Sequence, residues 1–327
     1  MRRRSINPLK KPLIRLLLVQ PAWWAAAALG ADGPSSALIP LPEGNQGIAA
    51  RYPGDRGIEA DPAVLFHDDF ESGDLRGKWD NSFQKADIRI AEEPENVHGG
   101  KRALEFTVPR QQAELSNGVV KDLKDGKDVV YMRYYSKFEK GFDQTASSHN
   151  GGILNALAPG VPYSTPGVRA DGRSKFIVSL ENWRGDAATA SPGWLNVYCY
   201  HPEQRSEYGD HFFPSGKVLP YSARPGDFGA DFVARPDIIP ELGRWYCLEL
   251  MVRANAAGRR DGRIACWLDG RLVADFPNLR LRDVDTLKIN SASLCLHIRS
   301  NAIRENKKWY DDVVVATAYI GPVAAAK

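Results

Sequence analysis

The sequence lacks the features that define several large classes of protein. After residue 30, no run of apolar residues approaches the length of about 18 that a membrane-spanning helix needs. It has no G-x-S-x-G nucleophile elbow, no P-loop and no dinucleotide-binding fingerprint. No candidate strand carries the closely spaced carboxylates of a retaining glycoside hydrolase. These absences exclude a membrane span after residue 30 and argue against those enzyme classes.

The chain also has little net charge. Its 43 Lys and Arg residues nearly balance 40 Asp and Glu residues, for a formal charge of +3. The first 30 residues hold six basic residues and no acidic one, which leaves 37 basic and 40 acidic residues in the remainder. A body without excess basic charge is not expected to bind nucleic acid.

The N-terminal segment has the pattern of an export signal. A basic stretch to Arg15 precedes two apolar runs, and residues 28–31 are Ala-Leu-Gly-Ala, which suits a signal peptidase. We expect a signal peptide over 1–30 and a secreted or periplasmic protein with no membrane association after signal removal; an uncleaved anchor is the alternative. Residues 31–62 are rich in Gly, Pro and Ala, which predicts a flexible linker, and 323–327 are expected to form a tail.

Cysteine is scarce, and its spacing is uninformative. None of the four cysteines forms a C-x-x-C pair, and each stands in an apolar or aromatic run. Export would permit two disulfides in any of three pairings, whereas burial within strands would leave four unpaired thiols. Both readings stay open, and a zinc site is not expected. The cysteines are Cys199, Cys247, Cys266 and Cys295.

From residue 63 onward, short alternating runs are separated by Gly, Pro, Asn and Asp, which is typical of β-strands joined by turns. No long amphipathic helix and no repeat is evident, so residues 63–322 are predicted to form one all-β domain. A sandwich of two antiparallel sheets, a β-jelly roll, fits best, and we expect a monomer. The predicted strands are Val64–Phe70, Arg102–Val108, Val129–Phe138, Lys175–Arg184, Trp194–His201, Trp245–Arg253, Arg263–Asp269, Lys288–Arg299 and Trp309–Thr317.

Alternation along three of these strands predicts a binding face. Successive side chains of a strand point to opposite sides of the sheet, so the apolar set can face the core while Tyr, Trp, Arg, Ser and Glu share the other side. Aromatic rings stack on the CH surfaces of sugars, and polar side chains bind the hydroxyls. We therefore predict a polysaccharide groove; an ordinary solvated face is the alternative. Its substrate-binding residues are predicted to be Ser179, Glu181, Trp183, Trp194, Asn196 and Tyr135.

Several motifs in order resemble a known family. Asp-Phe-Glu-Ser-Gly at 69–73, Val-His-Gly-Gly-Lys-Arg at 97–102 and Trp-Tyr-Asp-Asp-Val at 309–313 are the clearest. Val-Tyr-Met-Arg at 130–133, Trp-Tyr-Cys-Leu-Glu at 245–249 and Cys-Trp-Leu-Asp-Gly at 266–270 lie between them. Together they resemble concanavalin A-like jelly-roll proteins related to polysaccharide lyases, including alginate and glucuronan lyases and the fungal cellulose-induced protein group. The resemblance covers about residues 64–321.

The resemblance implies a structural calcium ion and no organic cofactor. Glu71 and Asp311 would supply carboxylates, and Gly99 and Arg102 would contribute backbone carbonyls. Such hard oxygen ligands suit Ca²⁺. Asp and Glu residues that merely end edge strands are the alternative.

The resemblance also implies β-elimination on a uronate-containing polymer. This reaction needs a group to neutralise the substrate carboxylate, a base for the C5 proton and an acid for the leaving oxygen. Tyr198 and Tyr200 match the Tyr-x-Tyr pair of alginate lyases, and Tyr200 is expected to act as acid or base with Tyr198 as its partner. His149, in a Gly-rich loop, suits proton transfer or carboxylate contact, and Arg133 is predicted to neutralise the carboxylate.

One residue departs from the alginate-lyase pattern. Where those enzymes have Ser-x-Arg, this chain has Ser179-Leu180-Glu181. A carboxylate there would repel an acidic substrate, so another Arg substitutes, the substrate differs, or catalysis has been lost. The sequence predicts an exported polysaccharide lyase acting on an acidic polysaccharide, with a non-catalytic, lectin-like carbohydrate-binding protein as the alternative.

Overall fold

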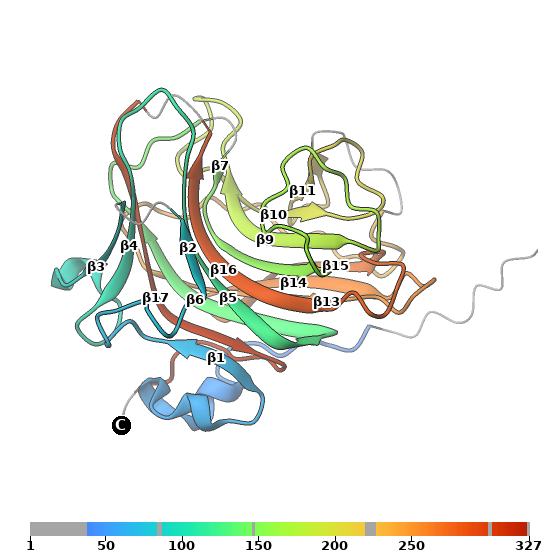
Figure 1. Cartoon of the computed structure of the whole chain (residues 1–327), viewed down its shortest axis with the longest axis horizontal. Coiled ribbons are helices and arrows are strands. Elements are labelled where there is room, and N and C mark those ends of the chain that lie inside the picture. Colours follow the sequence, from blue (N-terminus) through green and yellow to red (C-terminus); the bar gives the residue numbers. More distant parts are fainter. Residues whose placement is uncertain (1–37, 84–86, 146–147, 220–226, 300–302, 326–327) are drawn as a thin grey trace, which may run out of the picture. The chain divides into compact units, whose positions relative to one another are not determined.

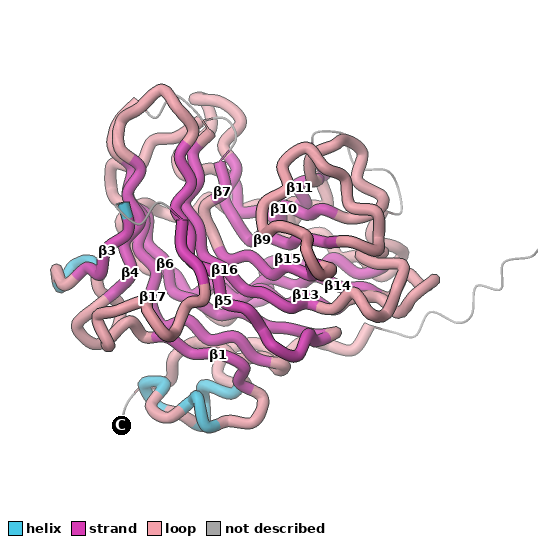
Figure 2. The backbone as a smooth tube through the Cα atoms, viewed as in Figure 1, coloured by secondary structure: helices cyan, strands magenta, loops and turns pink. Residues whose placement is uncertain are grey.

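The computed structural model describes residues 38–83, 87–145, 148–219, 227–299 and 303–325. The predicted signal peptide at 1–30 lies outside the described residues. Residues 39–327 form one compact unit, and the regular secondary structure of its described part is almost wholly β-strand (Figure 1). Helix is confined to single short turns, coloured cyan in Figure 2. In the described residues no helix has the length and apolar character needed to cross a lipid bilayer.

The first sheet, sheet A, has eight strands in the described residues. Their order is β15-β14-β13-β6-β17-β4-β3, with β1 paired to β17, and all pairs are antiparallel. The bounds are β1 Val64–Asp68, β3 Ile88–Ala91, β4 Ala103–Val108, β6 Val129–Phe138, β13 Tyr246–Arg253, β14 Gly262–Leu268, β15 Arg271–Leu279 and β17 Asn306–Ala316.

The second sheet, sheet B, has nine strands in the same described ranges. Their order is β12-β11-β10-β9-β8-β16-β5-β2, with β7 paired to β16, again antiparallel. The bounds are β2 Asn81–Phe83, β5 Leu115–Lys127, β7 Ser148–His149, β8 Gly152–Leu157, β9 Lys175–Trp183, β10 Trp194–Tyr200, β11 Asp210–Phe212, β12 Val218–Leu219 and β16 Ile289–Ile298.

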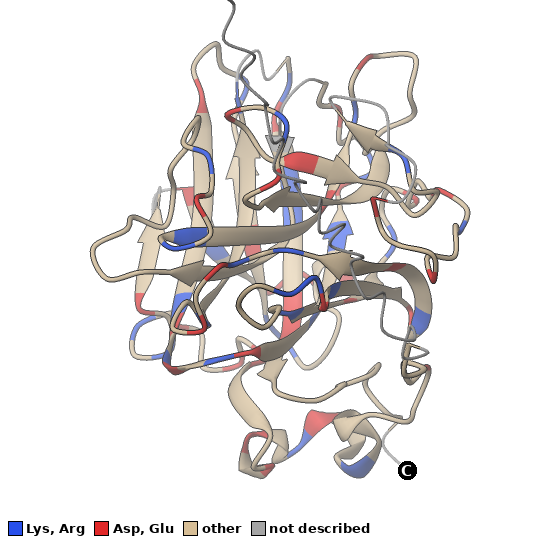
Figure 3. Ribbon diagram, turned by 90° about the vertical axis from the view of Figure 1, so that its right-hand side faces the viewer, with Lys and Arg blue, Asp and Glu red and all other residues tan. Residues whose placement is uncertain are grey.

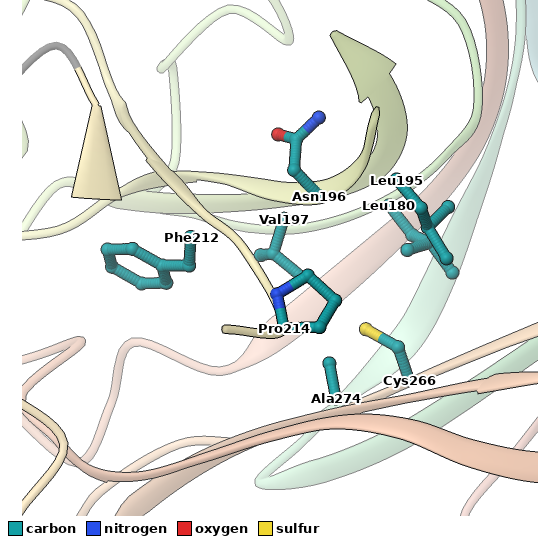
Figure 4. Close-up of a pocket in the computed structure, with 8 residues that line it drawn as sticks. All are labelled: Leu180, Leu195, Asn196, Val197, Phe212, Pro214, Cys266 and Ala274. Atoms are coloured by element: carbon teal, nitrogen blue, oxygen red, sulfur yellow. The ribbon is translucent and has the colours of Figure 1, made fainter. Parts of the chain in front are cut away.

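The two sheets enclose one large apolar core. Alternate residues of sheet B, such as Leu180 and Val197, pack there against residues of sheet A, such as Cys266. A small apolar space between the sheets leaves no room for a water molecule (Figure 4). Asn196 points away from this space, toward the opposite face of sheet B. The predicted all-β jelly-roll sandwich of two antiparallel sheets is thus confirmed.

The segment before β1 is part of the domain, and the predicted flexible linker at 31–62 is wrong for residues 39–62. This segment forms three short 3₁₀ helices, η1 Ile48–Arg51, η2 Pro53–Asp55 and η3 Ile58–Ala60, and buries Ile48 and Ile58. These side chains join Trp267 and Tyr319 in a second apolar cluster on the outer face of sheet A. The predicted tail also makes contacts, because Gly54 N–H donates to the carbonyl of Ala324 (2.8 Å).

Two further sequence features take a definite form in the structure. All four cysteines are buried free thiols, which settles the alternatives in favour of unpaired cysteines. Burial raises the pKa of both Cys247 and Cys295 to about 12, so these thiols are unreactive. Basic and acidic residues are both scattered over the ribbon in Figure 3, in keeping with the near balance of charge.

Candidate active site

The outer face of sheet B, away from the core, carries a cluster of aromatic and ionisable side chains. β9 and β10 pair so that Ser179 lies opposite Tyr198 and Glu181 lies opposite Asn196. β7 pairs with β16 and brings His149 opposite His297. These residues, together with His211 of β11, form the group that we call the histidine cluster: His149, Ser179, Glu181, Asn196, Tyr198, His211 and His297.

His149 is held by Glu181. Its Nδ1 lies 2.9 Å from Oε2 of Glu181, whose side chain is fully buried while that of His149 is 28% exposed. Burial lowers the pKa of His149, but the Glu181 carboxylate more than offsets this, and the pKa is raised above its usual value. The Glu181 carboxylate thus favours the imidazolium form of His149, in which Nδ1–H is directed at Glu181.

Tyr198 lies between two histidines. Its ring centroid is 4.7 Å from that of His149 and 4.7 Å from that of His211. Its hydroxyl oxygen accepts a hydrogen bond from Gly209 N–H (3.1 Å). Burial raises the pKa of Tyr198 far above its usual value, so the hydroxyl keeps its proton. The Gly209 N–H is placed to stabilise a phenolate once that proton has left.

Asn196 fixes the tautomer of His211. The Asn196 Nδ2 group donates to the backbone carbonyls of Trp194 (3.1 Å) and Glu181 (3.3 Å), so Oδ1 is the end that faces His211. Nδ1 of His211 lies 2.8 Å from this oxygen and must carry the hydrogen. Burial and the charge of His149 lower the pKa of His211 to about 3. His211 is thus neutral, with the lone pair on Nε2.

His297 completes the row of rings. It stacks on His149 with ring centroids 5.3 Å apart. Burial and the charge of His149 lower its pKa to about 4. Of these three histidines, His149 is the one whose pKa is raised, because the Glu181 carboxylate stabilises its proton, while a charge on His149 disfavours protonation of the other two rings.

The two predicted tryptophans border the cluster at the β11 end. Trp183 lies opposite Trp194 across β9 and β10, and its ring is 5.6 Å from that of His211. Trp194 is 36% exposed. Of the other predicted binding residues, Ser179, Glu181 and Asn196 lie on the predicted face but beneath the rings, at most 2% exposed. Glu181 and Asn196 therefore position the two histidines.

Tyr200 lies on the same face as Tyr198 but at the far side of the cluster. Its hydroxyl is 3.4 Å from that of Tyr198, and Lys175 Nζ lies 4.5 Å from the centroid of its ring. Tyr198, in contrast, contacts both His149 and His211. The geometry therefore favours Tyr198 over Tyr200 as the acid or base, reversing the order expected from the sequence.

The predictions for Arg133 and Tyr135 are wrong. Both lie on β6 of sheet A, outside the groove. Arg133 is 0% exposed and pairs with Asp55 of η2. Tyr135 stacks on His98 (3.6 Å), and its hydroxyl accepts from Val323 N–H (3.0 Å). Parity correctly placed both side chains opposite the core. It could not reveal which sheet they belong to, or that Asp55 pairs with Arg133 while His98 and Val323 contact Tyr135.

The carboxylates implied as calcium ligands accept hydrogen bonds from the loop at 98–102. Oδ2 of Asp311 accepts from the N–H groups of His98 (2.9 Å) and Gly99 (3.1 Å). Oε1 of Glu71 accepts from the N–H groups of Lys101 (2.7 Å) and Arg102 (2.8 Å). Calcium needs converging oxygen ligands, and here one oxygen of each carboxylate already accepts two N–H groups. In the described ranges no three His, Cys, Asp or Glu residues are grouped to hold a metal ion.

Sequence reasoning did not assign His211 or His297 to the site. Alternation along the predicted strand at 288–299 shows which residues share a face with His297, but it does not show which sheet that strand joins. His211 lies on a three-residue strand inside a long segment rich in Pro, Gly, Phe and Tyr, where no alternation is long enough to read. The pairing of β11 with β10 alone brings it to Tyr198.

Comparison with solved structures places the fold among polysaccharide lyases. Alginate lyase Aly36B in complex with an alginate trisaccharide has a TM-score of 0.54 and 17% identity, over 79% of this chain and 99% of that chain. Alginate lyase vAL-1 from Chlorella virus has a TM-score of 0.54 and 12% sequence identity, over 78% of this chain and 100% of that chain. The alginate lyase from Aplysia kurodai has a TM-score of 0.54 and 14% sequence identity, over 78% of this chain and 97% of that chain. No protein-family model and no curated protein matches the sequence.

At these identities the likeness establishes the fold. It confirms that this chain has the jelly-roll sandwich of the lyase-related family that its motifs resemble.

Proposed function

We propose that this protein is a polysaccharide lyase that cleaves a uronate-containing polymer by β-elimination. The observation that carries the proposal is the arrangement of His149, Tyr198 and His211 on one face of sheet B, with a histidine held by the Glu181 carboxylate and a neutral imidazole on either side of a protonated tyrosine. The fold shared with alginate lyases supports the same reaction class.

Each ring has the protonation state that one part of the reaction needs. The imidazolium of His149 pairs with the C6 carboxylate of the substrate and makes the C5 proton more acidic. Nε2 of His211 takes this proton with its lone pair, and the electron pair of the broken C5–H bond forms the C4=C5 double bond. The C4–O4 bond breaks, and the leaving oxygen takes the hydroxyl proton of Tyr198. No metal or organic cofactor takes part in this scheme.

We further propose that the protein is exported, since the N-terminal pattern and an extracellular polymeric substrate agree. An acidic polysaccharide is the expected partner because the Glu181 carboxylate favours the positively charged form of His149. A lectin-like protein could use the same face, but in such a protein the neutral His211 and the protonated Tyr198 would have no role in proton transfer.

The test is to mix the mature protein with glucuronan, alginate, pectate and glycosaminoglycans and to follow the ultraviolet absorbance of the C4=C5 double bond. We expect a rise with one polymer, abolished by Tyr198→Phe and by His211→Asn. Tyr208→Phe, at an exposed tyrosine, and His67→Asn, on sheet A, are matched controls that keep the activity. Retardation by a polymer in an affinity gel without any rise would contradict the proposal and favour the binding protein.

A further inference from the structure

Sheet B carries a second hollow beyond Tyr200. A cavity of about 670 Å³ opens over the ends of β5, β8 and β16, a volume within the usual range of roughly 300–1,000 Å³ for ligand pockets. Its polar lining includes Lys124, Tyr163, Arg173, Lys288, Asn290 and Ser291.

The cavity lies on the same face of the sheet as the histidine cluster. From Tyr200 one row of paired residues crosses the sheet through Ile177, Asn155 and Ser291 to Asp122. Ser291 and Asp122 line the cavity. Neighbouring strands are separated by about 4.8 Å, so the row spans about 19 Å along the sheet. A polymer bound at the cluster could reach the cavity, but a very short oligomer could not.

Two cations in the lining have no ion-pair partner in the described part of the chain. Lys124 and Arg173 are exposed, and neither side chain makes a hydrogen bond or ion pair there. Nearby acids are already engaged: Asp80 pairs with Lys121 (3.0 Å), and Asp283 pairs with Arg280 (2.7 Å). The third cation, Lys288, pairs with Asp128 (2.7 Å). Two positive charges therefore remain available to a ligand.

The rest of the lining suits a sugar ring. The hydroxyl of Tyr163 donates to Oδ1 of Asp122 (2.5 Å), which fixes the ring and engages the one acid of the lining. The tyrosine ring and the two free cations match the CH face and the carboxylate of a uronate unit.

We infer that this cavity is a distal binding site for an anionic sugar unit of the polymer cleaved at the histidine cluster. The inference rests on the proposed function, because it assumes that one polymer occupies both places. In this account Lys124 and Arg173 give the protein a preference for chains that are both long and acidic, whereas the chemical step depends on the histidine cluster alone.

The test is the double variant Lys124→Ala/Arg173→Ala, assayed on the polymer and on the shortest oligomer that is cleaved. We expect kcat/KM to fall roughly three- to tenfold on the polymer, since exposed ion pairs are individually weak, and to stay unchanged on the short oligomer. Lys101→Ala/Arg271→Ala removes the same charge from exposed positions outside sheet B and should leave both values unchanged. Equal losses on both substrates, or the same loss in the control, would overturn the distal site.

Failure of the proposed function is detected separately. If no polymer is cleaved, calorimetric binding of long acidic oligosaccharides to the wild type and to the double variant decides the matter. Weaker binding by Lys124→Ala/Arg173→Ala alone would support the cavity although the lyase reaction had failed. Equal binding by the wild type and both double variants would overturn the cavity as well.

Discussion

The carboxylate of Glu181 lies beneath His149, with Oε2 2.9 Å from Nδ1, and is shielded from solvent. The sequence places this acid where alginate lyases have an arginine, and repulsion of an acidic substrate would be expected if it were exposed. Because the Glu181 carboxylate is buried, it does not repel an acidic substrate. Instead it raises the pKa of His149 and so favours the positive charge on that partly exposed ring. The Glu181–His149 pair can thus supply the cation that the departure from the family pattern removed.

The pH dependence of kcat/KM should reveal this pair. The rate requires a neutral His211, whose pKa is about 3, and a protonated His149, whose pKa is raised. The rate therefore rises above about pH 3 and falls as pH passes the His149 pKa, which lies above its usual value. Glu181→Gln removes the carboxylate, burial then dominates, and the alkaline limb should move to lower pH.

Glu203→Gln is the matched control, since Glu203 is a surface acid paired with Arg260 outside the cluster. Its profile should superimpose on that of the wild type. An alkaline limb unmoved by Glu181→Gln would show that His149 does not provide the charge.

Asn196→Asp tests the role assigned to His211. The new carboxylate can still accept the Nδ1 hydrogen, but its charge stabilises the imidazolium and raises the pKa of His211. The acid limb of kcat/KM should therefore move to higher pH, with the alkaline limb little changed. Asn81→Asp, at an exposed residue of β2, is the control. A profile identical to that of the wild type would exclude His211 as the base.

Much of this site could be predicted from strand parity, and the remainder depended on sheet pairing. Alternation correctly placed Ser179, Glu181 and Asn196 on one face, because each strand there is long and its other side is apolar. Parity cannot say which sheet a strand joins, which is why Arg133 was assigned to the groove. It also cannot detect a cover formed by residues 39–62, whose apolar residues follow no period.

The covered Arg133 has a measurable consequence for stability. Its guanidinium and the Asp55 carboxylate are both almost fully buried and pair with each other. Asp55→Asn leaves an uncompensated buried charge, which should lower the free energy of unfolding by roughly 3–5 kcal/mol. Urea denaturation measures this change, and kcat per folded molecule should stay at the wild-type value. Unchanged stability together with a lost kcat would restore Arg133 to the active site.

The contacts of Glu71 predict that calcium does not hold the fold together. Since backbone N–H groups already occupy Oε1 of Glu71 and Oδ2 of Asp311, a chelator should leave the melting temperature unchanged. Glu71→Ala should destabilise the protein by roughly 1–3 kcal/mol by leaving those N–H groups without an acceptor. Thermal melts with and without chelator measure the first effect. A melting temperature lowered by the chelator and restored by calcium would contradict it.

The central claim is that the polymer is cut by elimination, and product analysis in water labelled with heavy oxygen tests it most directly. Elimination adds no water, so the account predicts products with an unsaturated terminal sugar and no label introduced at the cut. Hydrolysis would place labelled oxygen at each cut and leave saturated ends. Saturated, labelled products would contradict the lyase assignment, whatever the variants of His149, Tyr198 and His211 show.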